Sequence, residues 1–451
     1  MTRKRVFYGF ILFLLVILAG GVIYLSTLLP IITGYAAKNL CSAVFVSGRT
    51  PEDVEAWDLN FSFIKFTKNK VNYDEKSVRS RFLWGRSKAI YREGFGVTLL
   101  RDVREKKLRK ITFPAIAKPV SRQDTLSWPM GDKIPDSINT GIDLSALNEI
   151  TRRLVNEGGY GGNAYAFLVL HKGMPVAEAY DPQFGKETRF LSWSMAKSFT
   201  NALVGILVNE GRMDVSQPAE IEEWKGDDRS KITLNDLMQM QSGLEWNEDY
   251  GSRSDVNVML HCKGDMDRFA FNQPLEYPAG THWYYSSGTA NIISFLLREQ
   301  FNTDSAYYAF AYSQLFNRIG IDDAVFEVDA EGRFVASSYL YATARDYARF
   351  ALLFQNDGIF NGDTILPEGW VEYTRTPATQ SNGEYGALFW LNKSRELPSA
   401  PENMYQCVGH DGQRIFLLPD QQLIVIILGY SPASRGGMDF DRLLKDIMKT
   451  L

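Results

Sequence analysis

The sequence predicts an α/β (α+β) protein: an antiparallel sheet flanked by helices, with a helical subdomain, preceded by one transmembrane helix and a small β-rich module. Three observations lead to this prediction. Strand-like runs lie near both ends of residues 143–451 and enclose a helical middle. An uncharged apolar run lies close to the amino terminus. Between them, a stretch rich in β-branched and aromatic residues is broken by glycines, which is typical of short strands and hairpins.

The composition is that of a globular protein. The chain has 451 residues, of which 45% are hydrophobic and 23% charged, enough for two or three structural units. Its formal net charge of −4 argues against a nucleic-acid partner. The four histidines and three cysteines are scattered without metal-ligand spacing, so we expect no metal and no cofactor. We expect free buried thiols, and the sequence does not predict an oligomeric state.

The amino terminus predicts a membrane anchor. Three basic residues at positions 3–5 precede an uncharged run from Val6 to Leu29, which is long enough to cross a bilayer. Basic flanking residues keep their end in the cytoplasm, so the rest of the chain is expected in the periplasm or outside the cell. The alternative is a signal peptide cleaved after Ala36 or Ala37, but the length of the run favours a single-pass anchor.

These patterns divide the chain into five segments. Residues 1–5 form a basic cytoplasmic tail, residues 6–29 an anchor in the lipid bilayer, and residues 30–119 a juxtamembrane β-rich module. Residues 120–142, rich in Pro, Ser and Asp, form a linker to the main domain of residues 143–451. The β-rich module is basic, and two interpretations stay open. It faces anionic head groups beside the anchor, or it simply has a solvated face.

Within the main domain, local patterns predict individual elements. Helical periodicity ends at a glycine over residues 143–158, and two apolar runs meet at a Lys172–Gly173 turn in residues 164–180, which indicates a hairpin. Further helices are expected over 191–211, 232–244, 286–300 and 439–451, and strands over 414–419 and 421–430.

The stretch "LSWSMAKSFTNALVGILVNEG" carries the first chemical signal. Ser194 and Lys197 share a face of the predicted helix, at its amino end, where unpaired N–H groups favour an oxyanion. A desolvated lysine there can act as a base toward the serine. The alternative is a capping serine beside a surface lysine. A second Ser-x-x-Lys, from Ser62 to Lys65 in a segment predicted as strand, shows that the motif alone does not decide.

Two further motifs follow in order: Tyr285–Ser286–Ser287 at a loop-to-helix junction, and His410–Asp411–Gly412 ahead of the terminal hairpin. With the flanking stretches, such as "YGALFWLN", the three motifs resemble the serine β-lactamase and penicillin-binding-protein superfamily. The likeness is greatest to its branch of class C β-lactamases, DD-peptidases, carboxylesterases and 6-aminohexanoate-oligomer hydrolases. It covers residues from about 143 to 451.

The resemblance implies roles for catalytic residues. Ser194 is the expected nucleophile and Lys197 its proton acceptor or electrostatic partner. Tyr285, rather than Tyr284, is expected to act as a base, with its pKa lowered by two cations, and to return the proton to the leaving group.

The resemblance also implies substrate-binding residues. Ser287 stands where many relatives have asparagine, and His410 where classical β-lactamases have the lysine of Lys-Thr-Gly. Gly412 would let the backbone approach the substrate, and the N–H of Gln413 would join that of Ser194 in an oxyanion hole. The connection over residues 247–274 would overhang the cleft, with Tyr250 and His261 as further candidates.

The expected function is that of a membrane-anchored serine hydrolase that cleaves ester or amide bonds in small-molecule or short-peptide substrates through an acyl-enzyme. Two alternatives stay open: a catalytically inactive module that binds cell-wall peptide, and a DD-peptidase or true β-lactamase. Since a histidine at position 410 holds a substrate carboxylate less well than lysine does, esters and linear amides are favoured.

Overall fold

The computed structural model describes residues 3–116, 125–135 and 141–451. Its largest sheet has six strands in the order β12-β13-β14-β15-β5-β6, and all neighbours are antiparallel. The strands are β5 (Ala164–His171), β6 (Met174–Tyr180), β12 (Trp390–Leu391), β13 (Tyr405–Gly409), β14 (Gln413–Leu418) and β15 (Leu423–Gly429). The predicted antiparallel sheet is thereby confirmed, because the carboxyl-terminal strands pair with the predicted hairpin.

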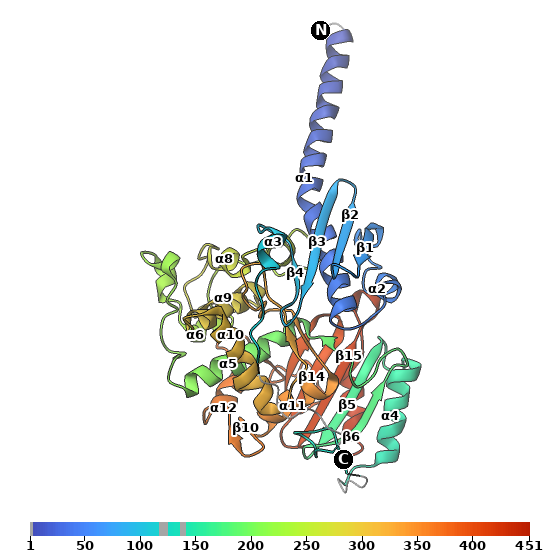
Figure 1. Cartoon of the computed structure of the whole chain (residues 1–451), viewed down its shortest axis with the longest axis vertical. Coiled ribbons are helices and arrows are strands. Elements are labelled where there is room, and N and C mark those ends of the chain that lie inside the picture. Colours follow the sequence, from blue (N-terminus) through green and yellow to red (C-terminus); the bar gives the residue numbers. More distant parts are fainter. Residues whose placement is uncertain (1–2, 117–124, 136–140) are drawn as a thin grey trace.

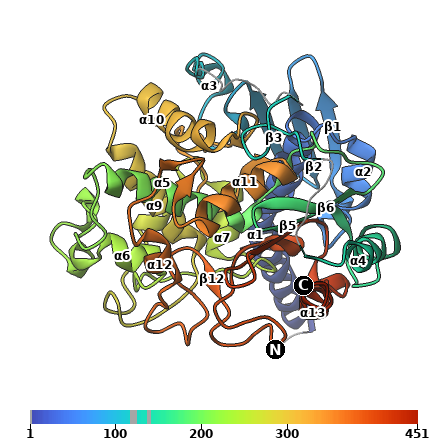
Figure 2. The same cartoon turned by 90° about the horizontal axis from the view of Figure 1, so that it is seen from below.

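Helices cover both faces of this sheet (Figure 2). Alternate residues of β5 point to opposite faces, so Leu168 joins a core with α11 (Ala344–Gln355), whereas Val169 joins a core with α4 (Leu144–Glu157) and α13 (Phe440–Met448). As the sequence predicted, α4 is followed by a glycine, Gly158, in the left-handed conformation at φ 61°.

The helical subdomain lies between the two halves of the sheet in the sequence. Its first helix, α5, follows a 3-10 turn at Trp193–Met195. The helices are α5 (Ala196–Asn209), α6 (Leu234–Met238), α7 (Asp255–Cys262), α8 (Met266–Phe271), α9 (Ser287–Glu299), α10 (Asp304–Phe310) and α12 (Trp370–Arg375). Short strands accompany them: β7 (Phe190–Leu191), β8 (Val325–Phe326) and β9 (Leu340–Ala342) form a small sheet, and β10 (Ile359–Phe360) pairs with β11 (Asp363–Thr364).

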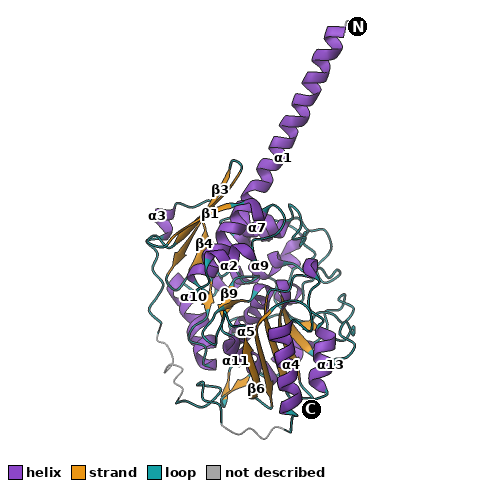
Figure 3. Ribbon diagram, turned by 90° about the vertical axis from the view of Figure 1, so that its right-hand side faces the viewer, coloured by secondary structure: helices purple, strands orange, loops and turns teal. Residues whose placement is uncertain are grey.

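The predicted β-rich module is an antiparallel meander beside the base of α1 (Figure 3). It consists of β1 (Lys68–Asn72), β2 (Ser77–Phe82), β3 (Gly85–Arg92) and β4 (Gly96–Leu99), with the short helices α2 (Pro51–Ala56) and α3 (Glu105–Leu108). The strand expected around Ser62 to Lys65 is wrong, because Ile64–Phe66 forms a 3-10 turn.

Helix α1 (Arg3–Phe45) continues well past Leu29, where the sequence placed the end of the anchor. Its first half projects from the body of the molecule (Figure 1). Its second half is buried because small apolar residues, such as Ala36 and Ala37, pack against the β2–β4 meander. Buried Lys38 also forms an ion pair with buried Glu327 of the main domain. The helix therefore belongs to the folded core as well as to the predicted anchor.

Parts of the predicted linker, residues 117–124 and 136–140, lie outside the described residues. The described part, residues 125–135, follows the surface of the main domain. Trp128 donates through Nε1 to the carbonyl of Gly173 at 2.9 Å, and Arg349 pairs with Asp132 at 2.6 Å.

Candidate active site

Ser194 and Lys197 lie together at the amino end of α5. The Lys197 Nζ is 3.1 Å from Ser194 Oγ, and it also contacts Ser287 Oγ at 3.1 Å and the carbonyl oxygen of Ser337 at 2.9 Å. The lysine side chain is almost fully buried, with 1% of its surface exposed. The alternative of a surface lysine is therefore wrong.

Burial lowers the pKa of Lys197 to about 8, because the ammonium form loses its hydration; the nearby carboxylate of Glu248 acts in the opposite direction. A neutral amine has two N–H donors and one lone pair. Those match the surroundings, since Ser287 Oγ and the Ser337 carbonyl can accept while the Ser194 hydroxyl donates to the lone pair. The arrangement can hold a base against the serine.

Tyr285 lies over the same lysine, with its ring centroid 4.7 Å from Lys197 Nζ and its hydroxyl interacting with Ser194. Tyr284, by contrast, is 44% exposed. Burial and the charge of Glu248 raise the pKa of Tyr285 above its usual value. The predicted lowering is therefore wrong, because the charged neighbour that shifts the pKa of Tyr285 is the anion Glu248. Tyr285 suits the role of a proton donor better than that of a phenolate base.

Glu248 connects several of these groups, and no sequence motif identified it. Its carboxylate accepts from the backbone N–H of Ser287 at 2.9 Å, from the Ser287 hydroxyl and from the Tyr250 hydroxyl at 3.0 Å. The indole of Trp246 donates to it at 2.6 Å. Ser287 thus accepts from Lys197 while it donates to Glu248. The only signal in the sequence was the position of Glu248 two residues before Tyr250 in the predicted overhanging connection.

The residue before the serine, Trp193, has a left-handed backbone with φ 45°, which is unusual for a bulky side chain. Its neighbours hold it there: the Ser192 hydroxyl donates to the Trp193 carbonyl at 2.8 Å, and the indole contacts His410 edge-on at 5.6 Å. On another side Tyr35 of α1 stacks on the indole at 6.5 Å. The helix that carries the predicted anchor therefore touches the residue next to Ser194.

The His410–Gly412 motif lies where β13 ends. His410 is partly exposed, stacks on Tyr250 at 5.0 Å and lies 3.3 Å from the carboxylate of Asp411. The backbone approaches the serine turn closely at Gly409, where an added Cβ would lie 2.2 Å from the carbonyl oxygen of Ser192. Gly412 has a φ of 91°, and a Cβ added to it would lie against the side chain of Ser431.

Gln413 is buried, and its side chain is fully used by the sheet. Its amide accepts from the N–H of Gly429 at 3.0 Å and donates to the Gly429 carbonyl at 2.7 Å. These bonds hold the start of β14 against β15. The other candidate in the overhanging connection, His261, contacts Tyr35 of α1 edge-on at 5.4 Å, and burial lowers its pKa to about 3. It belongs to the contact between α1 and α7.

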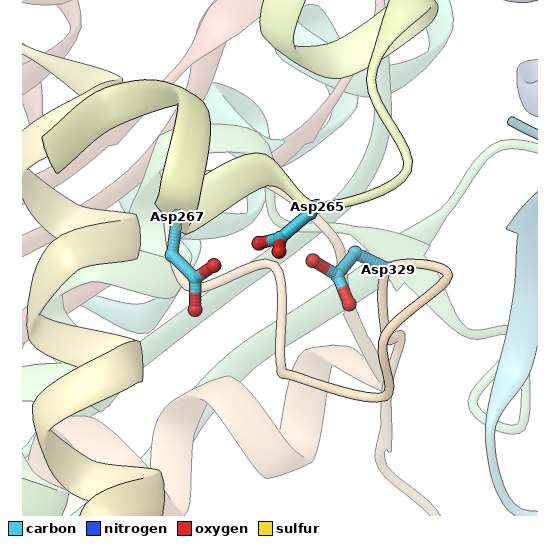
Figure 4. A group of neighbouring side chains, drawn as sticks. All are labelled: Asp265, Asp267 and Asp329. Atoms are coloured by element: carbon cyan, nitrogen blue, oxygen red, sulfur yellow. The ribbon is translucent and has the colours of Figure 1, made fainter. Parts of the chain in front are cut away.

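An acidic cluster lies elsewhere in the subdomain, where Asp265, Asp267 and Asp329 bring carboxylate oxygens within 4.8 Å of one another (Figure 4). Arg333 pairs with Asp265 at 3.3 Å and with Asp267 at 3.0 Å. Asp329 accepts backbone N–H groups from Met266 and Arg333. Since the protein's own arginine and amides meet these charges, the cluster fastens the 329–333 turn to α8.

The fold agrees with comparisons to known proteins. Residues 147–445 match the beta-lactamase family. The chain belongs to that family.

Individual relatives indicate which members of the beta-lactamase family the chain is similar to. The chain is 25% identical over 293 residues to the 6-aminohexanoate-dimer hydrolase of Paenarthrobacter ureafaciens, covering 59% of this chain and 72% of that protein. A Bacillus anthracis protein assigned as a 6-aminohexanoate-dimer hydrolase has the same fold, with a TM-score of 0.56, 20% identity and coverage of 75% of this chain and 90% of that one. The hydrolase EstCE1 also shares it, at a TM-score of 0.55 and 13% identity over 68% of this chain and 98% of its own. The protein is a β-lactamase-fold hydrolase homologous to 6-aminohexanoate-dimer hydrolase.

Proposed function

We propose that this protein is a membrane-anchored serine hydrolase that cleaves ester or linear amide bonds through an acyl-enzyme on Ser194. The observation that carries the proposal is the buried Lys197, whose Nζ lies 3.1 Å from Ser194 Oγ and whose pKa is lowered to about 8. A serine at a helix amino end, within hydrogen-bond distance of a lysine that can be neutral near physiological pH, is an activated nucleophile.

In the proposed mechanism, Ser194 Oγ forms a bond to the substrate carbonyl carbon while Lys197 takes the hydroxyl proton. The carbonyl electron pair moves to oxygen, where the backbone N–H groups of Ser194 and Gln413 stabilise the negative charge. As the intermediate collapses, the bond to the leaving alcohol or amine breaks. Tyr285, whose raised pKa keeps it protonated, passes a proton to the leaving group and recovers one from Lys197. Water then attacks the acyl-enzyme by the reverse route.

The surroundings favour substrates without a carboxylate next to the scissile bond. His410 stands in place of the lysine with which relatives hold a substrate anion, and the protein's own Asp411 carboxylate already lies 3.3 Å from its Nε2. Tyr285, Tyr385 and Trp390 pack ring to ring within 5.8 Å beside the lysine and offer an apolar wall. The relative from Paenarthrobacter ureafaciens is named for a linear amide, the 6-aminohexanoate dimer, which we take as a candidate substrate.

We further propose that the amino-terminal helix is retained as an anchor, with the hydrolase domain in the periplasm or outside the cell. Phe7–Phe45 is long and apolar enough to cross a membrane. Its exposed apolar part, Phe7 to Tyr24, extends about 27 Å, close to the thickness of a bilayer core of about 30 Å. Cleavage after Ala36 or Ala37 would cut the helix inside the buried core, which supports retention.

An activity-based probe tests the proposal. A fluorophosphonate and a labelled penicillin are applied to the wild-type chain, to Ser194→Ala, and to Ser62→Ala as a matched control in the other Ser-x-x-Lys sequence. We expect labelling of the wild type and of Ser62→Ala but not of Ser194→Ala. If neither probe labels the folded wild-type protein, the binding-module alternative is the better account.

A substrate panel then separates the enzyme classes: a chromogenic cephalosporin, a p-nitrophenyl butyrate-type ester, the 6-aminohexanoate dimer and a D-Ala-D-Ala peptide. We expect faster turnover of the ester or the linear amide. Efficient cephalosporin turnover without ester or linear-amide cleavage would contradict the substrate assignment. Amino-terminal sequencing of membrane-extracted protein that began near Lys38 would contradict retention of the anchor.

A further inference from the structure

The turn between β2 and β3 has an unusual composition. Leu83 and Trp84 form its two central residues, and their side chains are 61% and 52% exposed. Leu83 has a positive φ of 50°. Two-residue hairpin turns favour asparagine and glycine, because these residues tolerate a left-handed backbone and expose little apolar surface to water. Leucine and tryptophan are unfavourable here in water, so the turn is suited to apolar surroundings.

The turn lies where α1 leaves its exposed apolar stretch (Figure 1). The Trp84 indole donates to Ser26 Oγ at 3.1 Å, and Gly85 packs against Leu29. Ser26 lies two residues after Tyr24, where the exposed apolar part ends. If α1 crosses a bilayer with that part, the turn is at the level of the head groups, where tryptophan is enriched in membrane proteins.

Cations surround the turn on one face of the meander. Arg81 of β2 lies directly opposite Lys68 of β1 and Arg86 of β3. Like charges in directly opposite cross-strand positions destabilise a sheet. All three are exposed, and none makes an ion pair within the described residues. Lys88 on the same face, farther from the turn, pairs instead with Glu75 and Glu105.

Further apolar side chains lie beside the turn. Phe63 and Phe66 are 57% and 56% exposed, and each ring lies 6.4 Å from that of Phe82, the last residue of β2. We call the turn, these aromatic residues and the three cations together the hairpin patch: Phe63, Phe66, Lys68, Arg81, Phe82, Leu83, Trp84 and Arg86. It combines an apolar tip with an unpaired cationic rim.

We propose that the hairpin patch docks on the bilayer that α1 crosses, with Leu83 and Trp84 inserted at head-group level and Lys68, Arg81 and Arg86 bound to phosphates of anionic phospholipids. The inference rests on the anchor proposed above. An anionic leaflet satisfies the three cations, and the interfacial region accepts the exposed leucine and aromatic rings. Because the second half of α1 is packed into the folded core, this second contact limits tilting and rotation of the whole molecule in the bilayer and sets the orientation of the active site relative to the membrane.

The test uses the full-length chain in nanodiscs of phosphatidylcholine, with or without phosphatidylglycerol. An environment-sensitive NBD fluorophore is attached at Leu83→Cys in a Cys262→Ser background, since Cys41 and Cys407 are buried. Nitroxide-labelled lipids quench the fluorophore if it is inserted. Ile17→Cys reports on the anchor itself, and exposed Ile359→Cys, on β10 at the end of the molecule away from α1, serves as the aqueous control (Figure 1).

We expect quenching at positions 17 and 83 but not at 359, and stronger quenching at 83 when phosphatidylglycerol is present. Quenching at 17 without quenching at 83 would overturn the docking and leave the anchor intact. Absence of quenching at both would overturn both proposals. A blue-shifted but unquenched label at 83 would mean that protein covers the patch, and would also overturn the docking on lipid.

Charge variants test the anionic lipid. Arg81→Gln with Arg86→Gln is compared with Lys225→Gln and Lys231→Gln, exposed lysines of the hydrolase domain that give the same change in net charge. We expect the hairpin variant to lower the ratio of inserted to exposed label by about fivefold per cation in phosphatidylglycerol nanodiscs. The control pair should leave that ratio unchanged. Equal insertion in both lipids, unaffected by the arginine changes, would refute the binding of anionic phospholipids.

Discussion

The pH dependence of the reaction offers the sharpest test of Lys197 as the base. Burial lowers its pKa to about 8, so the neutral, proton-accepting form dominates only above that pH. For a base with this pKa, kcat/KM is expected to fall about tenfold for each pH unit below 8, and to be about one hundredfold below its plateau at pH 6. In a plot of log kcat/KM against pH, the acidic limb should therefore have a slope of one.

Substitution of Glu248 should shift the pKa of Lys197 in a direction that the structure defines. Its carboxylate raises the pKa of Lys197 against the effect of burial, so Glu248→Gln should move the limb to lower pH. The change removes charge while it keeps an amide oxygen that can accept from Ser287. Glu245→Gln, at an exposed position three residues before Glu248, removes an equal charge and should leave the midpoint unchanged.

The assay measures kcat/KM for a p-nitrophenyl ester between pH 5.5 and 9.5, with hydrolysis by Ser194→Ala subtracted at each pH. A midpoint near 10, or a flat profile across this range, would refute the role of Lys197 as a neutral base. A shift of the Glu248→Gln limb to higher pH would refute the electrostatic argument.

Other perturbations test the site and its supports. Lys197→Ala combined with Tyr285→Phe should lower kcat little beyond the worse single change, because the two groups share one proton. Lys38→Met should destabilise folding by about 3–5 kcal/mol in urea unfolding, because it leaves the Glu327 carboxylate buried and unpaired. Gly409→Ala should reduce both activity and thermal stability, because its Cβ would lie 2.2 Å from a backbone oxygen next to the serine turn.

Each of these has a control. Fully multiplicative losses in the Lys197 and Tyr285 cycle would show independent roles. Lys38→Met with Glu327→Gln should recover part of the stability lost in the single variant, and no recovery would contradict the ion-pair explanation. Gly185→Ala, where nothing lies within 4 Å of the added Cβ, should be silent, and an equal loss there would undermine the steric argument for Gly409.

Local patterns were sufficient for much of the fold. The β5–β6 hairpin, the terminal strands and α4 were predicted because alternation, helical periodicity and turn glycines act between residues close in sequence. The proximity of Ser194 to Lys197 could also be predicted from residues close in sequence, since residues three positions apart on a helix share a face. The order of the three motifs then led to the family, which the match over residues 147–445 establishes.

Tertiary structure decided what depends on distant residues. Helix α1 continues past Leu29 because the β-rich module and Glu327, 289 residues after Lys38, cover its second half. Glu248 is set against Ser287 by a loop that no motif marked. The sign of a pKa shift also needs the fold. The sequence supplied a lysine and a tyrosine, but burial lowers the pKa of Lys197 against the opposing effect of Glu248, whereas burial and Glu248 together raise the pKa of Tyr285. Desolvation is a property of the packed molecule, so no pattern along the chain could determine it.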